Sequence, residues 1–300
     1  MLTMALATLM SIVMFDAKVS LSGDDCDYIL AADDFWHHFA FPGHHGSLYP
    51  IVLSPFVGLF GYRLVLLKFL SVLFTVGAFG FLYKAFERRI PSAVLIPSML
   101  LAAICSYIFF YAGYTYSEPL FMLLQSIYFY FFSRYFWVEG GTPSYTLRKD
   151  WKKYLTLGAL TLAMGLTREI GFCVIGVVIL YFAIKGRWKD LLYTVGAALL
   201  MLAAFYLIKG ILWSNVQVGT SFTNLMAKDY YNPNAGMEDT AGLLSRFWDN
   251  SRVYLSAFLC QMMGVMPETP SNRFDMSATR TLIIYGLYFA ALVVILVRRD

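Results

Sequence analysis

The side chains best suited to chemistry lie near the start of the chain, in an acidic and aromatic stretch over residues 22–55. This stretch places five aspartates and four histidines between two apolar segments. Asp24 and Asp25 come directly after the first apolar segment. An ionised carboxylate there could act as general base toward a hydroxyl group, while the second acid orients it or holds a metal ion. An exposed acidic loop without a catalytic role is the alternative.

The four histidines of the same stretch invite a metal-site interpretation, because imidazole and carboxylate groups together bind zinc and other divalent ions. They are His37, His38, His44 and His45. Adjacent histidines, however, point to different faces of a helix. We therefore favour hydrogen bonding at a wet interface, or contact with a substrate phosphate, and assign no metal site.

Further charges lie at the ends of later apolar segments, at Glu118, Arg168 and Glu169. Charges in such positions usually face the interior of a helix bundle or a water-filled cavity. The planar guanidinium of Arg168 offers a fork of donors that matches phosphate oxygens. An internal Arg–Glu pair that only locks helices together is the alternative. Lys228, in a long polar connection, is a second candidate for an anionic substrate, although a solvated loop residue is the favoured interpretation.

The composition is that of a membrane protein. The chain is 59% hydrophobic and 14% charged, whereas soluble domains average about 25% charged residues. The net charge of +4 does not indicate a nucleic-acid partner, because the basic residues lie at the ends of apolar segments. The four cysteines lack metal-ligand spacing. A Cys26–Cys260 bridge stays open, and small apolar fillers are the favoured role.

Long apolar segments recur along the chain, and a helix needs about 20 such residues to cross a bilayer. They cover residues 2–15, 62–83, 91–113, 118–138, 154–167, 170–184, 190–213 and 281–297. We therefore expect an all-α integral membrane protein, a polytopic bundle of about eight transmembrane helices. The first segment could be a signal peptide, but no Lys or Arg precedes it, which favours a membrane helix.

Basic residues gather in alternate loops, which predicts the orientation of the chain. The clusters are Lys84/Arg88/Arg89, Arg134 with Arg148/Lys149/Lys152/Lys153, Lys185/Arg187/Lys189, and Arg298/Arg299. The positive-inside rule assigns these loops to the cytoplasm of a cell-membrane protein. The acidic stretch and the 214–280 connection then face the extracytoplasmic side. We expect short interfacial helices in that first loop, including one over 47–60, and surface helices in 214–280.

Four motifs and their order along the chain resemble those of the polyprenyl-phosphate-sugar-dependent glycosyltransferases of the GT-C fold. They are Asp24-Asp25-Cys-Asp-Tyr28, Gly46-Ser-Leu-Tyr-Pro50, Tyr116-Ser-Glu-Pro-Leu-Phe121 and Gly165-Leu-Thr-Arg-Glu-Ile-Gly171. Together they span roughly the first 185 residues. They look most like the GPI mannosyltransferase group and its bacterial relatives, and less like protein O-mannosyltransferases and the aminoarabinose transferase of lipid A.

The resemblance implies an inverting transfer of a sugar, with mannose a candidate, from a polyprenyl-phosphate donor. The acceptor would be an extracytoplasmic hydroxyl of a glycan, lipid or protein, and no cofactor is expected, with a divalent cation left open. Asp24 would be the general base with Asp25 its neighbour, and Arg168 and Lys228 would contact the donor phosphate. The substrate cavity would include Tyr28, His44, His45, Tyr49, Glu118 and Glu169.

The resemblance also implies a domain organisation, in which residues 1–213 form the transmembrane catalytic module. Residues 214–300 would hold the extracytoplasmic loop and the last transmembrane helix. The chain departs from the family in three respects. It has no soluble C-terminal domain, it has Asp25 where several subfamilies have Glu, and its histidine run has no counterpart.

A multipass transporter or flippase of lipid-linked glycans is the rival interpretation. It would use Glu118, Arg168 and Glu169 as an intramembrane pathway, and it predicts charges near mid-membrane and a repeat between the two halves. Here the charges cluster at the outer ends of the segments, and the sequence shows no repeat. A scaffold subunit without activity is a third, weaker interpretation.

Overall fold

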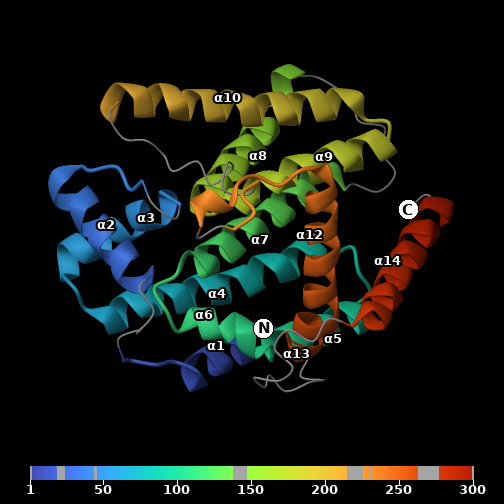
Figure 1. Ribbon diagram of the computed structural model, residues 1–300, viewed down its shortest axis with the longest axis horizontal. Helices are drawn as coiled ribbons and strands as arrows, with labels where there is room; N and C mark the ends of the chain where they lie inside the picture. Colours follow the sequence, from blue (N-terminus) through green and yellow to red (C-terminus); the bar gives the residue numbers. More distant parts are fainter. Residues whose placement is uncertain are drawn as a thin grey trace. The chain divides into compact units, whose positions relative to one another are not determined.

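The computed structural model describes residues 2–18, 24–43, 46–137, 147–214, 226–229, 232–262 and 277–298. Over these residues the chain is helical and has no strand, apart from one antiparallel bridge between Ala227 and Met237. The predicted all-α class is confirmed. The chain divides into two compact units, Met1–Gly219 and Thr220–Asp300, whose helices are labelled in Figure 1.

The first unit holds ten α-helices and one 3-10 helix in its described part. They are α1 (Leu2–Val13), α2 (Asp24–His38), α3 (Leu48–Phe60), α4 (Leu64–Phe86), α5 (Ser92–Ala103), α6 (Ser106–Ala112), α7 (Ser117–Phe136), α8 (Leu147–Thr167), η1 (Glu169–Phe172), α9 (Cys173–Ile184) and α10 (Trp188–Leu212). The acidic stretch is therefore helical from Asp24 onward. The predicted segment 91–113 is two helices, because Ile104 and Cys105 leave helical geometry between them.

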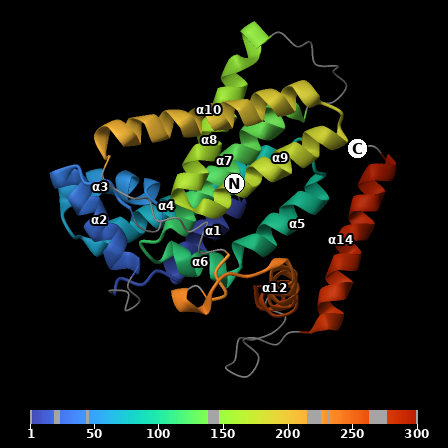
Figure 2. The same ribbon diagram turned by 45° about the horizontal axis from the view of Figure 1, so that its top comes forward.

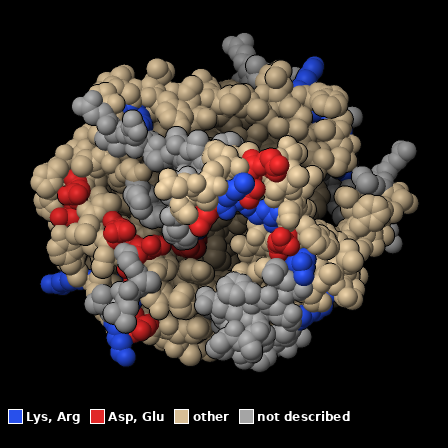
Figure 3. Space-filling model, viewed as in Figure 1, with Lys and Arg blue, Asp and Glu red and all other residues tan. Residues whose placement is uncertain are grey.

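Two helices, α4 and α10, are long and apolar enough to cross a membrane. Several other predicted crossings are shorter apolar helices, among them α1 and α5. Large apolar side chains on α10 are exposed, including Leu207 and Ile211, and most of the face in Figure 3 carries no charged residue. These observations are compatible with a membrane protein. The predicted number of crossings is not confirmed.

Three apolar clusters hold the first unit together. The cluster that supports the candidate site packs α2 and α3 against α4 and α7, through residues such as Tyr28, Tyr49, Leu67 and Leu120. Figures 1 and 2 both show α2 and α3 side by side. A second cluster joins α7, α8, α9 and α10, and a third joins α1, α4, α5 and α6. Helices α4 and α7, which pack on each other, take part in two clusters each.

A buried carboxylate ties α10 to the helices beside it. Asp190 is 0% exposed. It accepts a hydrogen bond of 2.6 Å from the Tyr154 hydroxyl on α8 and one of 2.8 Å from Nε of Arg187. The same guanidinium donates through Nη1 to the carbonyl of Phe136, at the end of α7. Because a buried charge is costly unless it is paired, this contact fixes the start of α10 against two neighbouring helices.

The cysteines are free in the structure. Cys105 is buried, and the interpretation as a small apolar filler suits it. Cys26 and Cys173 are exposed, so that interpretation is wrong for these two.

The second unit contains short helices and one longer one. They are η2 (Pro233–Ala235), α12 (Thr240–Arg252), the π-helix η3 (Val253–Phe258), α13 (Leu259–Met262) and α14 (Ala278–Arg298). Asp239 caps α12 by accepting a hydrogen bond from the backbone amide of Gly242. Arg246 donates to the Ala227 carbonyl at 2.6 Å and pairs with Glu238 at 2.9 Å. It thereby holds the two sides of the Ala227–Met237 bridge together.

Candidate functional site

The Ser117 hydroxyl brings together three parts of the first unit that are far apart in sequence. Tyr28 of α2 donates a hydrogen bond to Ser117 Oγ at 3.1 Å, and Nη1 of Arg168, just after α8, donates to the same oxygen at 3.4 Å. Arg168 also forms an ion pair with Glu118. We call Tyr28, Ser117, Glu118 and Arg168 the Ser117 cluster. Three members of this cluster, Tyr28, Glu118 and Arg168, are predicted site residues. Arg168 contacts Glu118 directly and shares the Ser117 hydroxyl with Tyr28.

The Arg168–Glu118 pair lies at the surface of the unit. The side chains are 40% and 27% exposed, respectively. Glu118 is in the first turn of α7, where its charge is stabilised by the helix dipole. The alternative interpretation predicted an internal Arg–Glu pair. The ion pair is present, but it is accessible to solvent and not internal. An anion arriving from solvent can reach the guanidinium.

The two adjacent acids at the start of α2 have different environments. Asp24 is exposed, whereas Asp25 is only 2% exposed. Oδ1 of Asp25 accepts hydrogen bonds of 2.8 Å from both the backbone amide and the hydroxyl of Thr115. Its Oδ2 is buried without a hydrogen-bond partner. Asp25 therefore binds the protein's own backbone, and Asp24 is the acid that can meet a substrate.

Tyr28 and Tyr49 form the buried wall behind the cluster. Their rings meet edge to face with centroids 5.0 Å apart. Burial raises the pKa of Tyr28, and the nearby negative charges of Glu118 and Asp24 add to this. Burial likewise raises the pKa of Tyr49. Both hydroxyls therefore stay protonated at neutral pH. Asp24 and Tyr28 are four residues apart on α2, so they lie on the same side of that helix.

Glycines explain how the Arg168 turn is held in place. A Cβ on Gly171 would lie 2.6 Å from the Met164 carbonyl oxygen. This distance is shorter than any contact that a Cβ atom normally makes. Gly165 packs against the ring of Phe172, and Gly46, at φ +90°, packs against the Thr167 backbone. Only glycine allows these approaches, and at Gly46 the positive φ also favours it. Two of the sequence motifs, Gly46–Pro50 and Gly165–Gly171, therefore meet at this turn.

Four predicted site residues remain, namely Glu169, Lys228, His44 and His45. Glu169 is exposed at the start of η1. Lys228 is exposed and belongs to the second unit. His44 and His45 lie outside the described residues. Among the described residues, no three His, Cys, Asp or Glu side chains gather to hold a metal ion.

The first pair of histidines interacts within its own helix. Nδ1 of His37 is 3.2 Å from Asp33, and Nδ1 of His38 is 3.6 Å from Asp34. Each pair joins residues four apart on exposed positions of α2. These contacts agree with the interpretation of the histidines as surface hydrogen-bonding groups.

Sequence reasoning missed Lys68, which lies on α4 and is 1% exposed. Its Nζ donates to the carbonyls of Asp16 at 2.9 Å and Lys18 at 2.6 Å, and lies 5.0 Å from the centre of the Tyr114 ring. A signal was available, because Lys68 is the only charged residue in 64–83, the part of the apolar segment that follows Arg63, and such charges are rarely without a role.

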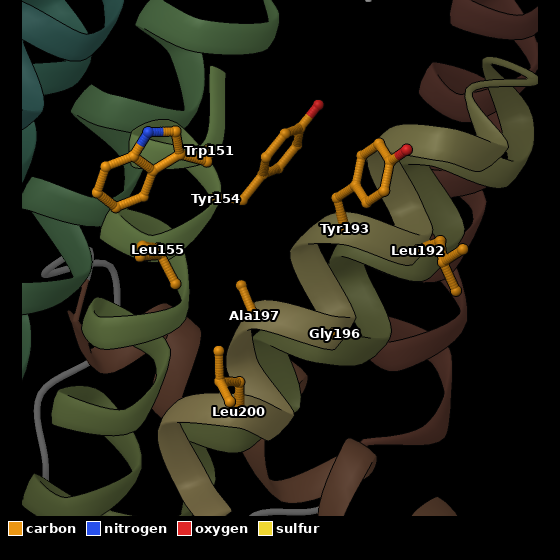
Figure 4. Close-up of a pocket in the computed structure, with 8 residues that line it drawn as sticks. All are labelled: Trp151, Tyr154, Leu155, Leu192, Tyr193, Gly196, Ala197 and Leu200. Atoms are coloured by element: carbon orange, nitrogen blue, oxygen red, sulfur yellow. The ribbon is translucent and has the colours of Figure 1, made fainter. Parts of the chain in front are cut away.

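An apolar groove of about 300 Å³ lies between α8 and α10, away from these residues. Figure 4 shows Trp151, Tyr154 and Leu155 of α8 facing Tyr193, Ala197 and Leu200 of α10. No member of the Ser117 cluster lines it. The groove therefore plays no part in the candidate site.

Comparison of the chain with protein-family models, with curated proteins and with solved structures found no match in any of the three.

Proposed function

We propose that this protein is a membrane glycosyltransferase that moves a sugar from a polyprenyl-phosphate donor to an acceptor hydroxyl, with inversion at the anomeric carbon. Asp24 is the general base, and Arg168 contacts the donor phosphate. Mannose is the candidate sugar, and a glycan, lipid or protein supplies the acceptor. In this proposal the protein crosses the cell membrane several times, and the reaction takes place on the extracytoplasmic side.

The observation that supports this proposal most directly is the shared contact on Ser117. Through this hydroxyl, Arg168 lies against Tyr28, which is one helical turn from Asp24. An accessible carboxylate and an accessible guanidinium are thereby placed at one end of the unit. Attack on an anomeric carbon needs a base on the acceptor side and stabilised charge on the phosphate side. In this proposal Asp24 is the base and Arg168 stabilises the phosphate charge.

The environment of the two acids assigns their roles. Asp24 is exposed and can approach an acceptor hydroxyl, whereas the Oδ1 of Asp25 is occupied by Thr115. Glu118 pairs with Arg168. In the proposed reaction the donor phosphate competes with Glu118 for the guanidinium, since both are anions that match its donors.

Release of polyprenyl phosphate from polyprenyl-phosphate sugars tests this function, using purified protein and candidate membrane acceptors. Asp24→Asn keeps the shape of the side chain but removes the basicity, so it should reduce release by about 10²–10⁴-fold. Asp27→Asn is the matched control, because Asp27 is also exposed in the first turn of α2. Full turnover by Asp24→Asn would show that Asp24 is not the base.

A transporter or flippase of lipid-linked glycans is the second candidate. The buried ammonium of Lys68, inside the apolar helix α4, is the observation that favours it, because charges within spanning helices often belong to transport pathways. Reconstituted vesicles distinguish the two candidates. Movement of a lipid-linked glycan across the bilayer without release of polyprenyl phosphate would replace the enzyme proposal.

A further inference from the structure

Two buried charges contact one short segment, residues 113–116, which joins α6 to α7. Lys68 contacts the ring of Tyr114 from one helix, and Asp25 binds Thr115 from another. Because Tyr114 and Thr115 are consecutive, the two charges act on neighbouring residues. None of the ion pairs in the described part of the chain includes Lys68 or Asp25.

The Lys68 ammonium makes contacts that are all with the backbone or a ring. Its two hydrogen bonds go to the carbonyls of Asp16 and Lys18, in the segment that follows α1. Its third interaction is with the face of Tyr114, at 5.0 Å. A desolvated cation over an aromatic face is stabilised by the ring quadrupole. Lys68 thus joins α4, the segment after α1 and residue 114.

The Asp25 carboxylate binds the next residue of the segment. It accepts from both donors of Thr115, each at 2.8 Å, and Thr115 is itself 0% exposed. Hydrogen bonds to an ionised acceptor in a buried place are stronger than neutral ones. Asp25 therefore fixes the backbone of residue 115 as well as its side chain.

We propose that Lys68 and Asp25 are positioning residues, which hold segment 113–116 between them and so place Ser117 and Glu118 at the site. The two following residues, Ser117 and Glu118, are the ones that contact Arg168. A shift of the segment would move both groups that hold the guanidinium. This inference rests on the proposed function for its catalytic consequence, but the placement of the segment can be measured without any substrate.

Hydrogen–deuterium exchange on the purified full chain provides that measurement. Lys68→Met and Asp25→Asn should each speed exchange of the amides over 114–118 by about tenfold or more. The first removes the cation that contacts the Tyr114 ring, and the second removes the charge that strengthens the two hydrogen bonds from Thr115. Lys84→Met and Asp27→Asn are matched controls, because these residues are exposed on the same two helices. Both controls should leave exchange over 114–118 unchanged.

A milder variant keeps the test valid if Lys68→Met does not fold. Thr115→Val removes the hydroxyl that donates to Asp25 while keeping the shape of the side chain. It should also speed exchange over 114–118, with the amides of α10 unchanged. Exchange within about twofold of wild type in every folded variant of Lys68, Asp25 and Thr115 would overturn the inference.

Steady-state kinetics separates positioning from a general loss of folded protein. If Arg168 is displaced, the KM for the polyprenyl-phosphate sugar should rise several-fold and kcat should fall. A merely structural role would lower the amount of active enzyme and leave that KM unchanged. If the wild-type protein had no activity, the proposed function would be contradicted. The expected exchange results would still support the placement of the segment. Active variants with unchanged KM and unchanged exchange would contradict the positioning role alone.

Discussion

Replacing Arg168 by Gln should affect catalysis far more than stability. The substitution removes the charge and the forked donors, and leaves a shorter polar side chain. In the folded protein without donor, it removes the ion pair to Glu118 and the 3.4 Å hydrogen bond to Ser117. In the proposed reaction it also removes the contact with the leaving phosphate.

The exposure of the ion pair sets the size of the stability effect. With side chains 40% and 27% exposed, the pair is largely screened by solvent. Such pairs stabilise the folded state by about 0–1 kcal/mol. A charge-assisted hydrogen bond to the phosphate contributes about 1.5–3 kcal/mol. Since about 1.4 kcal/mol corresponds to a factor of ten, losing one such bond should slow release roughly tenfold to 150-fold.

The assay combines thermal unfolding in detergent with release of polyprenyl phosphate by the same preparation. Arg63→Gln is the matched control, because Arg63 is an exposed arginine just before α4. The control should change neither quantity. Release by Arg168→Gln at the wild-type rate would refute the assignment of Arg168 to the phosphate. A loss of more than about 2 kcal/mol of stability would show instead that the pair is mainly structural.

Two further predictions concern the packing that holds the site. Asp190→Ala should lower the free energy of unfolding by about 3–5 kcal/mol, because it leaves the Arg187 guanidinium without its buried partner; thermal unfolding measures this. Gly171→Ala should displace the Arg168 turn, since a Cβ would lie 2.6 Å from the Met164 carbonyl oxygen, and should lower both stability and release of polyprenyl phosphate.

Each of these two predictions has a matched control. Asp249→Asn changes an aspartate that is 52% exposed in its pair with Arg252, and should change stability by at most about 0.5 kcal/mol. Gly176→Ala places a Cβ in open space on α9, and should be neutral or slightly stabilising. If Asp190→Ala or Gly171→Ala behaved like its control, the corresponding packing argument would be wrong.

The long helices could be predicted from the sequence. The apolar segments 62–83 and 190–213 appear as α4 and α10, within a few residues of the expected ends. Long runs of apolar residues between charges leave few alternatives to a helix, because the backbone must satisfy its hydrogen bonds locally. The break between α5 and α6 could not be predicted, because Ile104 and Cys105 are as apolar as their neighbours.

Some site residues could be chosen from sequence, but their contacts could not. Arg168 and Glu118 stood out as charges beside apolar segments, yet they are 50 residues apart and nothing local indicates that they pair. Ser117, which joins Arg168 to Tyr28, carried no signal of its own. Lys68 did carry one, as the only charged residue in the apolar run 64–83.

The sequence by itself determined the helical class, the two longest apolar helices and the residue types available for chemistry. Those properties follow from composition and local spacing. Only the tertiary structure decided that Asp24 is exposed while Asp25 is buried on Thr115. Consecutive residues on a helix point about 100° apart, so the face that packs against the rest of the unit determines which acid meets solvent. That choice depends on helices α6 and α7, about 90 residues further along the chain.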